Sequence, residues 1–196
     1  TGLGNETITV SDANITSAEA NTIDGYTDGV VTATISTTDI TALDDLTGTG
    51  NAYTITVGTA SVTAAALKAV NDATTVAVTA TAVTAITGSA SDLDSIYTSG
   101  VSGLGNETVT VSDADVTAAH LNTINAGTNV NVVATAVTNI TGSKTELATT
   151  YGGGMTGLGN ETITVSDANI TSAEANIIDG YTDGAVTATI STTAIA

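Results

Sequence analysis

The chain contains no cysteine, proline, tryptophan, phenylalanine or arginine, and its only lysines are Lys68 and Lys144. Because cysteine is missing, the chain has no disulfide framework and no thiolate metal site. Twenty aspartates and glutamates give it a net charge of −18 at pH 7. Binding to nucleic acid depends on basic side chains that release counterions from phosphates, so this charge balance predicts no nucleic-acid partner.

Long apolar runs are also missing, since no stretch reaches the roughly 18 apolar residues of a transmembrane helix. We therefore expect no insertion into a membrane. The only methionine is Met155 and no signal peptide is visible, which favours a mature product or a segment of a longer chain. Highly charged chains with few aromatic residues are often disordered. Here 41% of the residues are hydrophobic and they recur at regular spacing, which predicts a folded protein.

Catalytic motifs are absent as well. The only histidine, His120, stands where related segments have Glu19, Ala66 and Glu174, which indicates a position on a helix surface. The sequence has no CxxC or HExxH motif and no phosphate-binding glycine loop with its lysine. We therefore predict that the protein is not an enzyme and has no catalytic residues and no organic cofactor.

The sequence repeats itself at a distance of 155 residues. The 21 residues from Thr1, TGLGNETITVSDANITSAEAN, return unchanged from Thr156. A shorter signature, GNETITVSDANIT or a variant of it, divides the chain into four units of approximately 1–49, 50–102, 103–155 and 156–196, the last of them incomplete. Such internal periodicity predicts a single repeat array across residues 1–196.

Each unit divides again into two related halves of 22–30 residues. A half begins with an alternating run such as Val31–Ile35 or Tyr53–Val57, in which period two and β-branched residues predict a half-buried strand. A single apolar anchor residue follows and predicts a second, very short strand. The anchors are Ile15, Ile40, Val62, Ile86, Val116, Ile140, Ile170 and Ile195. Glycine-rich segments at 98–107 and 151–161 account for the longer halves and are predicted to be surface loops.

Helix starts follow several of the anchors. The predicted capping pairs are Thr16 with Glu19, Ser89 with Asp92, Ser143 with Glu146, and Thr171 with Glu174. Apolar residues then recur at helical spacing, and we expect short helices that end at glycine or asparagine. The predicted fold is an α/β solenoid of about eight stacked coils, each with a strand, a short second strand and a short helix. The alternative is an all-β solenoid in which the helical stretches are loops.

Paired threonines separated by one residue recur along the predicted strands. They are Thr7, Thr9, Thr32, Thr34, Thr54, Thr56, Thr79, Thr81, Thr108, Thr110, Thr162, Thr164, Thr187 and Thr189. If the strands lie side by side, these residues form a flat outward array, the predicted threonine face, of the kind that ice-binding solenoids display. The other interpretation is that threonine is simply favoured on the exposed side of a strand.

Aspartates gather in the sequence DGYTDG, which occurs twice. Asp24, Asp28, Asp179 and Asp183 are the calcium candidates, because calcium prefers six to eight oxygen ligands, many of them carboxylates. Neither the EF-hand pattern nor the GGxGxDxUx repeat is present. The alternative is an acidic surface that is only solvated.

The motifs TGLGNETITVSDANIT, TAVTNITGS and SDLDSIYTSGVSGLGNE resemble tandem repeats in giant secreted or cell-surface proteins of marine picocyanobacteria and related marine bacteria. The resemblance covers essentially the whole chain. It implies an extracellular or cell-surface location and a structural or adhesive array, and it supplies no catalytic residues.

Together these observations predict an extracellular structural repeat protein: a rigid acidic spacer, a surface-layer element or a self-assembling filament element. Its partners would be itself, by end-to-end stacking, or neighbouring repeats of a longer chain, because the open ends of a solenoid expose strand edges. The alternative is a binding module, either a calcium-dependent adhesin or an ice-binding protein that uses the threonine face.

Overall fold

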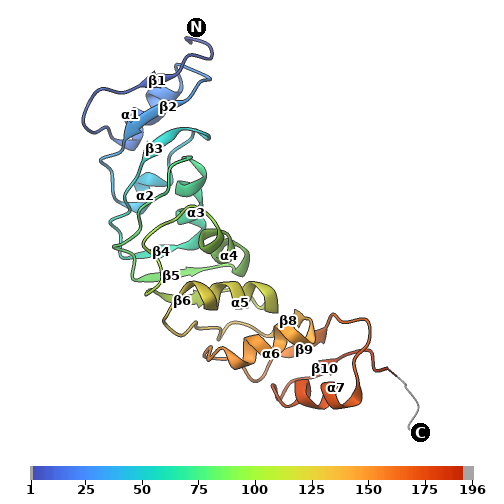
Figure 1. Cartoon of the computed structure of the whole chain (residues 1–196). Helices are drawn as coiled ribbons and strands as arrows, with labels where there is room; N and C mark the ends of the chain where they lie inside the picture. The colour runs from blue at the N-terminus through green and yellow to red at the C-terminus, as the bar shows by residue number, and fades with distance from the viewer. Residues whose placement is uncertain (1, 192–196) are drawn as a thin grey trace. The chain divides into compact units, whose positions relative to one another are not determined.

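The computed structural model describes residues 2–191 (Figure 1). The predicted anchor Ile195 lies outside these residues. In chain order the elements are β1 (Ile8–Thr9), α1 (Ser17–Asp24), β2 (Val31–Thr34), α2 (Ile40–Leu43), β3 (Ala52–Thr54), β4 (Ser61–Thr63), α3 (Ala64–Asp72), β5 (Ala85–Gly88), α4 (Ala90–Thr98), β6 (Thr108–Val111), β7 (Asp115–Thr117), α5 (Ala118–Gly127), β8 (Asn139–Gly142), α6 (Lys144–Gly152), β9 (Thr162–Val165), α7 (Ser172–Asp179) and β10 (Val186–Thr187). No helix within residues 2–191 has both the length and the apolar character needed to cross a bilayer.

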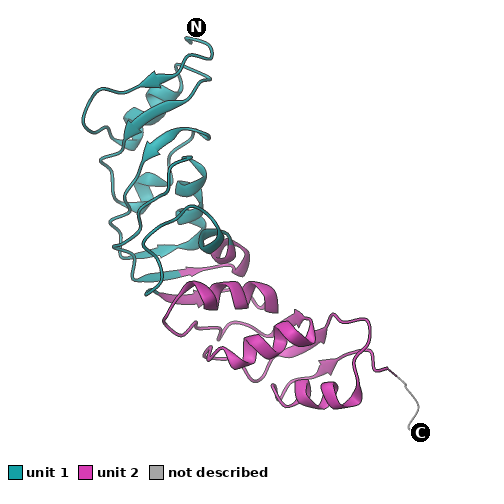
Figure 2. Cartoon of the chain, in the orientation of Figure 1, with its two compact units in different colours: residues 1–86, 95–107 teal, residues 87–94, 108–196 magenta. Residues whose placement is uncertain are grey.

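The chain divides into two compact units, residues 1–86 with 95–107, and residues 87–94 with 108–196 (Figure 2). Unit 1 contains a parallel sheet in the order β1-β2-β3, and unit 2 contains a parallel sheet in the order β7-β8-β9-β10. A third parallel sheet includes β4 and β5. The fold is therefore α/β, with repeated strand–helix segments, and the all-β alternative is wrong.

Strand register brings similar residues of successive segments together. In unit 2 Ile140 pairs with Ile163, and in unit 1 Ile8 pairs with Val31. The predicted alternation is confirmed in β2, where Val31 and Ala33 are buried while Thr32 and Thr34 are exposed. A paired central strand uses backbone N–H groups on both sides, which is consistent with a chain that lacks proline.

The apolar anchors form the predicted short strands in most segments. Ile15 pairs with Ile35 and Ile170 with Ile190 through single parallel bridges. The other anchors within strands are Val62 in β4, Ile86 in β5, Val116 in β7 and Ile140 in β8. Ile40 differs, because it begins α2 instead of forming a strand. The physical reason is the preceding residue, Asp39. Its carboxylate accepts a hydrogen bond from the Thr41 N–H at 2.9 Å and caps the helix.

The capping prediction is confirmed at the starts of α1, α6 and α7. In each, the N-cap hydroxyl accepts the backbone N–H of the glutamate three residues later, and that glutamate accepts the backbone N–H of the cap. Ser89 and Asp92 also exchange hydrogen bonds at the start of α4. Glycine ends α1, α6 and α7 as expected, whereas α3 ends at Ala73. Sequence inspection missed the caps Thr63 and Thr117, which lack a glutamate partner.

The core consists of side chains that point from the helices toward the strands. Leu67 and Val70 of α3 are fully buried, as are Leu121 and Ile124 of α5. Burying one such side chain contributes about 1.5–3 kcal/mol. One strand and one short helix enclose too little apolar surface alone, so each segment depends on its neighbours for a core.

Candidate functional site: the repeated glutamate loops and the exposed face of the first segment

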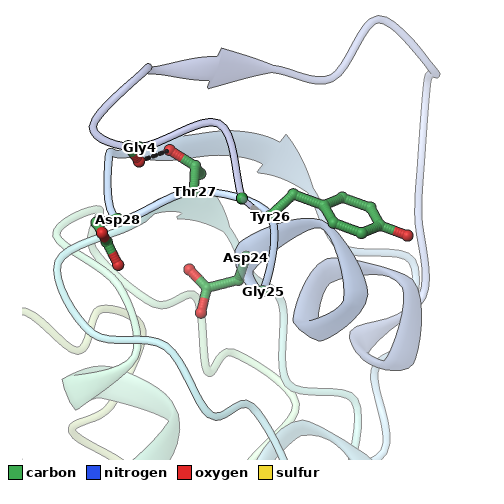
Figure 3. Close-up of a pocket in the computed structure, with 7 residues that line it drawn as sticks. Gly4, Asp24, Gly25, Tyr26, Thr27 and Asp28 are labelled. Atoms are coloured by element: carbon green, nitrogen blue, oxygen red, sulfur yellow. Dashed lines mark hydrogen bonds between the residues drawn. The ribbon is translucent and has the colours of Figure 1, made fainter.

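Two of the calcium candidates, Asp24 and Asp28, line a hollow of about 490 Å³ in unit 1 (Figure 3). The remaining lining residues are Gly2, Gly4, Gly25, Tyr26 and Thr27. Asp24 is already engaged, because its Oδ1 accepts a hydrogen bond from Asn51 Nδ2 at 2.7 Å. The Tyr26 ring points away from both aspartates (Figure 3).

The other two candidates, Asp179 at the end of α7 and Asp183 after it, occupy the equivalent positions and are exposed. Among the described residues 2–191, no three or more histidine, aspartate or glutamate side chains gather closely enough to hold a metal ion. Calcium in proteins takes six to eight oxygen ligands. The hollow therefore offers two carboxylates rather than a complete cage, and calcium binding stays a prediction.

The register of the sheets decides which residues of the predicted threonine face are neighbours. All fourteen are exposed except Thr79 and Thr110, which are half-buried. The threonine neighbours among them are Thr9 with Thr32, Thr34 with Thr54, Thr56 with Thr79, and Thr164 with Thr187. Elsewhere a threonine of the predicted face pairs with a different residue: Thr32 also pairs with Ala52, Thr110 with Val133 and Thr162 with Asn139. The sheets thus contain threonine pairs rather than the regular two-column array.

One longer column of threonines occurs in unit 2. Thr117, Thr141, Thr164 and Thr187 are successive partners across β7, β8, β9 and β10, and all four are exposed. Sequence inspection missed Thr117 and Thr141, because neither belongs to a Thr-x-Thr pair. A comparison of residues two positions after each asparagine or aspartate at a strand start would have found them.

His120 lies on α5 beside a second hollow of about 380 Å³ in unit 2. Asp113 and Asp115 line the same hollow, and Asp113 Oδ2 accepts the Ala90 N–H at 2.7 Å. The histidine lies on the helix, as the sequence predicted, and its side chain is half-buried. That the protein is not an enzyme stays a prediction.

The most specific polar arrangement is a pair of buried glutamates that sequence inspection did not single out. Glu107 and Glu161 end the two predicted surface loops, yet each is only 1% exposed. Glu161 accepts N–H hydrogen bonds from Gly159 at 2.8 Å and Asn160 at 2.9 Å, and the Tyr151 hydroxyl also donates to it. Several donors are needed to offset the cost of burying a carboxylate.

Glu107 has the same surroundings in unit 1. It accepts hydrogen bonds from the N–H groups of Gly105 and Asn106 and from the Tyr97 hydroxyl. Tyrosine and glutamate are ten residues apart in both cases, and this shared spacing is the signal that could have revealed the pair. Gly105 has a φ of 129°, a left-handed conformation that favours glycine and turns the loop N–H groups toward the carboxylate.

The environment of the two tyrosines raises the pKa of their hydroxyls. For both Tyr97 and Tyr151 the main cause is burial, which disfavours the charged phenolate. The hydrogen bond to the glutamate and the negative charge of that carboxylate raise the pKa further. Both hydroxyls therefore stay protonated, and remain hydrogen-bond donors, at pH values well above the usual pKa of a phenol.

The first GLGNE copy, residues 2–6, lacks this enclosure. Glu6 is exposed, and Leu3 is 60% exposed. The loop conformation also differs: Gly4 has a φ of 85°, whereas its equivalents Gly105 and Gly159 have values of 129° and 126°. Identical residues thus adopt a closed form where a tyrosine-bearing helix precedes them in the chain, and an open form in the first copy.

In unit 2, α6 also contacts the second copy of the 21-residue sequence, residues 156–176. The Lys144 N–H donates to Asp167 Oδ2 at 2.6 Å, and Lys144 Nζ lies 2.5 Å from Glu174 Oε1. The Lys144 side chain is the largest cause that lowers the pKa of Glu174, to about 2, and the Thr171 cap adds to this effect. At the other end of α6 the Tyr151 ring stacks on Tyr181, with ring centroids 4.9 Å apart.

Comparison of the chain with family models, with curated proteins and with solved structures found no match. The buried glutamates accept hydrogen bonds from their own loop and from the preceding helix. Each one therefore fixes the position of its loop relative to the segment before it, and we call this its locking role.

We predict that Glu161→Ala destabilises the protein by about 3 kcal/mol, because two backbone N–H groups and one hydroxyl lose their buried acceptor. Glu6→Ala is the matched control in an identical motif, and should change the free energy of unfolding by less than about 0.5 kcal/mol. Urea unfolding followed by circular dichroism measures both values. Equal losses in the two variants would contradict the locking role.

A second prediction concerns alkaline pH. The unfolded chain loses tyrosine protons near pH 10, roughly the model value, whereas the raised pKa keeps Tyr97 and Tyr151 protonated in the folded state. Above about pH 10 the unfolded state therefore binds fewer protons, and the free energy of unfolding falls as the pH rises. Urea titrations between about pH 9 and 11 should show this slope flattened in Tyr97→Phe/Tyr151→Phe.

The control for this experiment is Tyr26→Phe, which removes a hydroxyl that is exposed and keeps both glutamate–tyrosine pairs intact. If the double variant retained the slope of the parent chain, the two hydroxyls would not be responsible for the loss of stability in alkali.

Proposed function

We propose that this protein is an extracellular structural repeat protein, in which the strand–helix segments form a continuous α/β solenoid. The solenoid acts as a rigid acidic spacer, a surface-layer element or a self-assembling filament element. The observation that carries this proposal is the different burial of identical residues in the two copies of the repeated sequence. The main binding surfaces of the protein are the faces at the two ends of the array, and they bind further segments of the same kind.

The strands at either end of the described chain illustrate the point. Ile163 of β9 is fully buried and pairs with Ile140 of the preceding strand β8, whereas the identical Ile8 of β1 is only half-buried. The opposite holds for the residue that bridges to the anchor: Ile35, the partner of Ile15, is 4% exposed, whereas the identical Ile190, the partner of Ile170, is 39% exposed. Each end thus presents an apolar face that another segment of the same kind covers elsewhere in the chain.

The charge distribution favours a spacer that avoids non-specific partners. Only two cationic side chains oppose twenty carboxylates, and both lysines form ion pairs, with Asp72 and Glu174 respectively. The remaining carboxylates give the surface a strongly negative potential, which favours solubility and repels other acidic surfaces. The extracellular assignment draws support from the resemblance to secreted repeat proteins.

Electron microscopy of the purified chain at micromolar concentration, with and without calcium, tests this function. Filaments in both conditions would support end-to-end assembly. Filaments only with calcium would support assembly by calcium bridging, for which Asp24, Asp28, Asp179 and Asp183 are the candidate ligands. Separate particles in both conditions would contradict self-assembly and leave only the spacer role.

A pair of variants makes the microscopy sharper. Ile8→Asp places a charge on the apolar edge of β1 and should abolish filaments, because an unpaired buried charge is strongly unfavourable. Thr9→Asp, on the exposed side of the same strand, is the matched control and should leave filaments intact. Filaments that form equally well from Ile8→Asp would rule out this face as the assembly surface.

A binding function has one observation in its favour, the exposed column Thr117, Thr141, Thr164 and Thr187 in unit 2. Neighbouring parallel strands are about 4.8 Å apart, so the column presents hydroxyl and methyl groups at a regular spacing. If it binds ice, the chain should show thermal hysteresis, and Thr141→Val/Thr164→Val should reduce it. An inactive parent chain would eliminate the ice-binding hypothesis.

A further inference from the structure

We propose that the first strand–helix segment of the chain, which contains β1 and α1, carries a specific interaction surface for another repeat coil of the type formed by residues 132–152. Such a coil consists of a strand and a helix that begins with lysine and carries a tyrosine in its last turn. We define this first-segment face by Glu6, Ile8, Asp12, Glu19 and Tyr26. The inference rests on the proposed structural function and deepens it by naming the partner and the contacts that recognise it.

Strand pairing supplies the first argument. In unit 2, β9 pairs with β8 through the registers Ile140–Ile163 and Gly142–Val165. The N–H groups of Thr162 and Ser166 donate to the carbonyls of Thr138 and Gly142, at 2.8 and 2.9 Å. Thr7, Ile8, Val10 and Ser11 are the identical residues in the first segment. A strand like β8 therefore meets the same donors and the same apolar side chains there.

The start of the partner helix supplies the second argument. Lys144 contacts the second copy twice, through its N–H to Asp167 and through Nζ to Glu174. The equivalent carboxylates in the first segment are Asp12 and Glu19, and both are exposed. In a chain with only two lysines, one of them is thus used to join adjacent segments. The first segment presents the same two acceptors to a partner.

The end of the partner helix supplies the third argument. Tyr151 donates its hydroxyl to Glu161 and stacks its ring on Tyr181. The equivalents are Glu6, which is exposed, and Tyr26, which is 55% exposed. One tyrosine can therefore satisfy a carboxylate and cover an aromatic ring at the same time. These three sets of contacts together specify a repeat coil as the occupant, because they require a strand edge, a cation and a phenol in fixed register.

The test extends the full chain by joining a second copy of residues 102–155 ahead of Thr1. The new Met155–Thr1 bond reproduces the natural Met155–Thr156 sequence, so the junction adds no foreign residue. Because the chain has no cysteine, an introduced pair can form only one intramolecular disulfide. We place the pair at Lys144→Cys of the added segment and at Asp12→Cys.

Two controls calibrate the trapping. Lys144→Cys/Asp167→Cys in the parent chain is the positive control, because it uses the same contact where the structure contains it. A pair of Lys144→Cys in the added segment with Asn14→Cys is the register control. We expect the Asp12 pair to reach the yield of the positive control and the Asn14 pair to stay below it. Equal yields for the Asp12 and Asn14 pairs, or no disulfide at Asp12, would overturn the proposal.

Phenolate absorbance of the cysteine-free extended chain gives an independent readout. A docked Tyr151 of the added segment keeps its proton at about pH 10.5, because burial against Glu6 disfavours the phenolate. The extended chain should then show no more phenolate than the parent chain. One additional ionised tyrosine would overturn the docking, whatever the disulfide yields.

The outcome is separable from that of the proposed function. Docking of the added coil by a chain that forms no filaments in electron micrographs would retain the interaction surface and remove the assembly role. Filaments formed by a chain that fails both docking tests would retain assembly and eliminate this surface as its cause.

Discussion

Parallel hydrogen bonding between the strands of successive segments is the interaction on which the rest of the structure depends. It holds Ile140 against Ile163 in unit 2 and Ile8 against Val31 in unit 1. Since side chains alternate along a strand, this register sends isoleucine and valine inward and threonine outward. The helices then close over an apolar stripe that no single segment could bury alone.

The glutamate loops show how the repeat accommodates its longest connections. Each loop brings a carboxylate beneath the surface, where Glu107 and Glu161 bind two backbone N–H groups and a tyrosine hydroxyl. Removal of any one partner leaves a buried polar group unsatisfied, so the loop conformation and the position of the preceding helix depend on each other. The lock therefore acts between segments as well as within the loop.

Local features were readable from the sequence because they depend on residues only a few positions apart. Thr16 and Glu19 predicted a capped helix start, and the alternating residues from Val31 predicted β2. The threonine column and the buried Glu161 were not readable in this way. They depend on which strand lies beside which, and on a tyrosine ten residues away that meets the carboxylate only after a helix has packed.

The repeated 21 residues mark the boundary between the two kinds of information. By itself the sequence determined the strand, the helix cap and the acidic character of both copies, because these follow from local propensity and composition. Only the tertiary structure decided that Glu161 is buried and Glu6 exposed. The physical reason is that burial is a property of neighbours: β8 and α6 pack against the second copy and cover its side chains, whereas the same side chains are more exposed in the first copy.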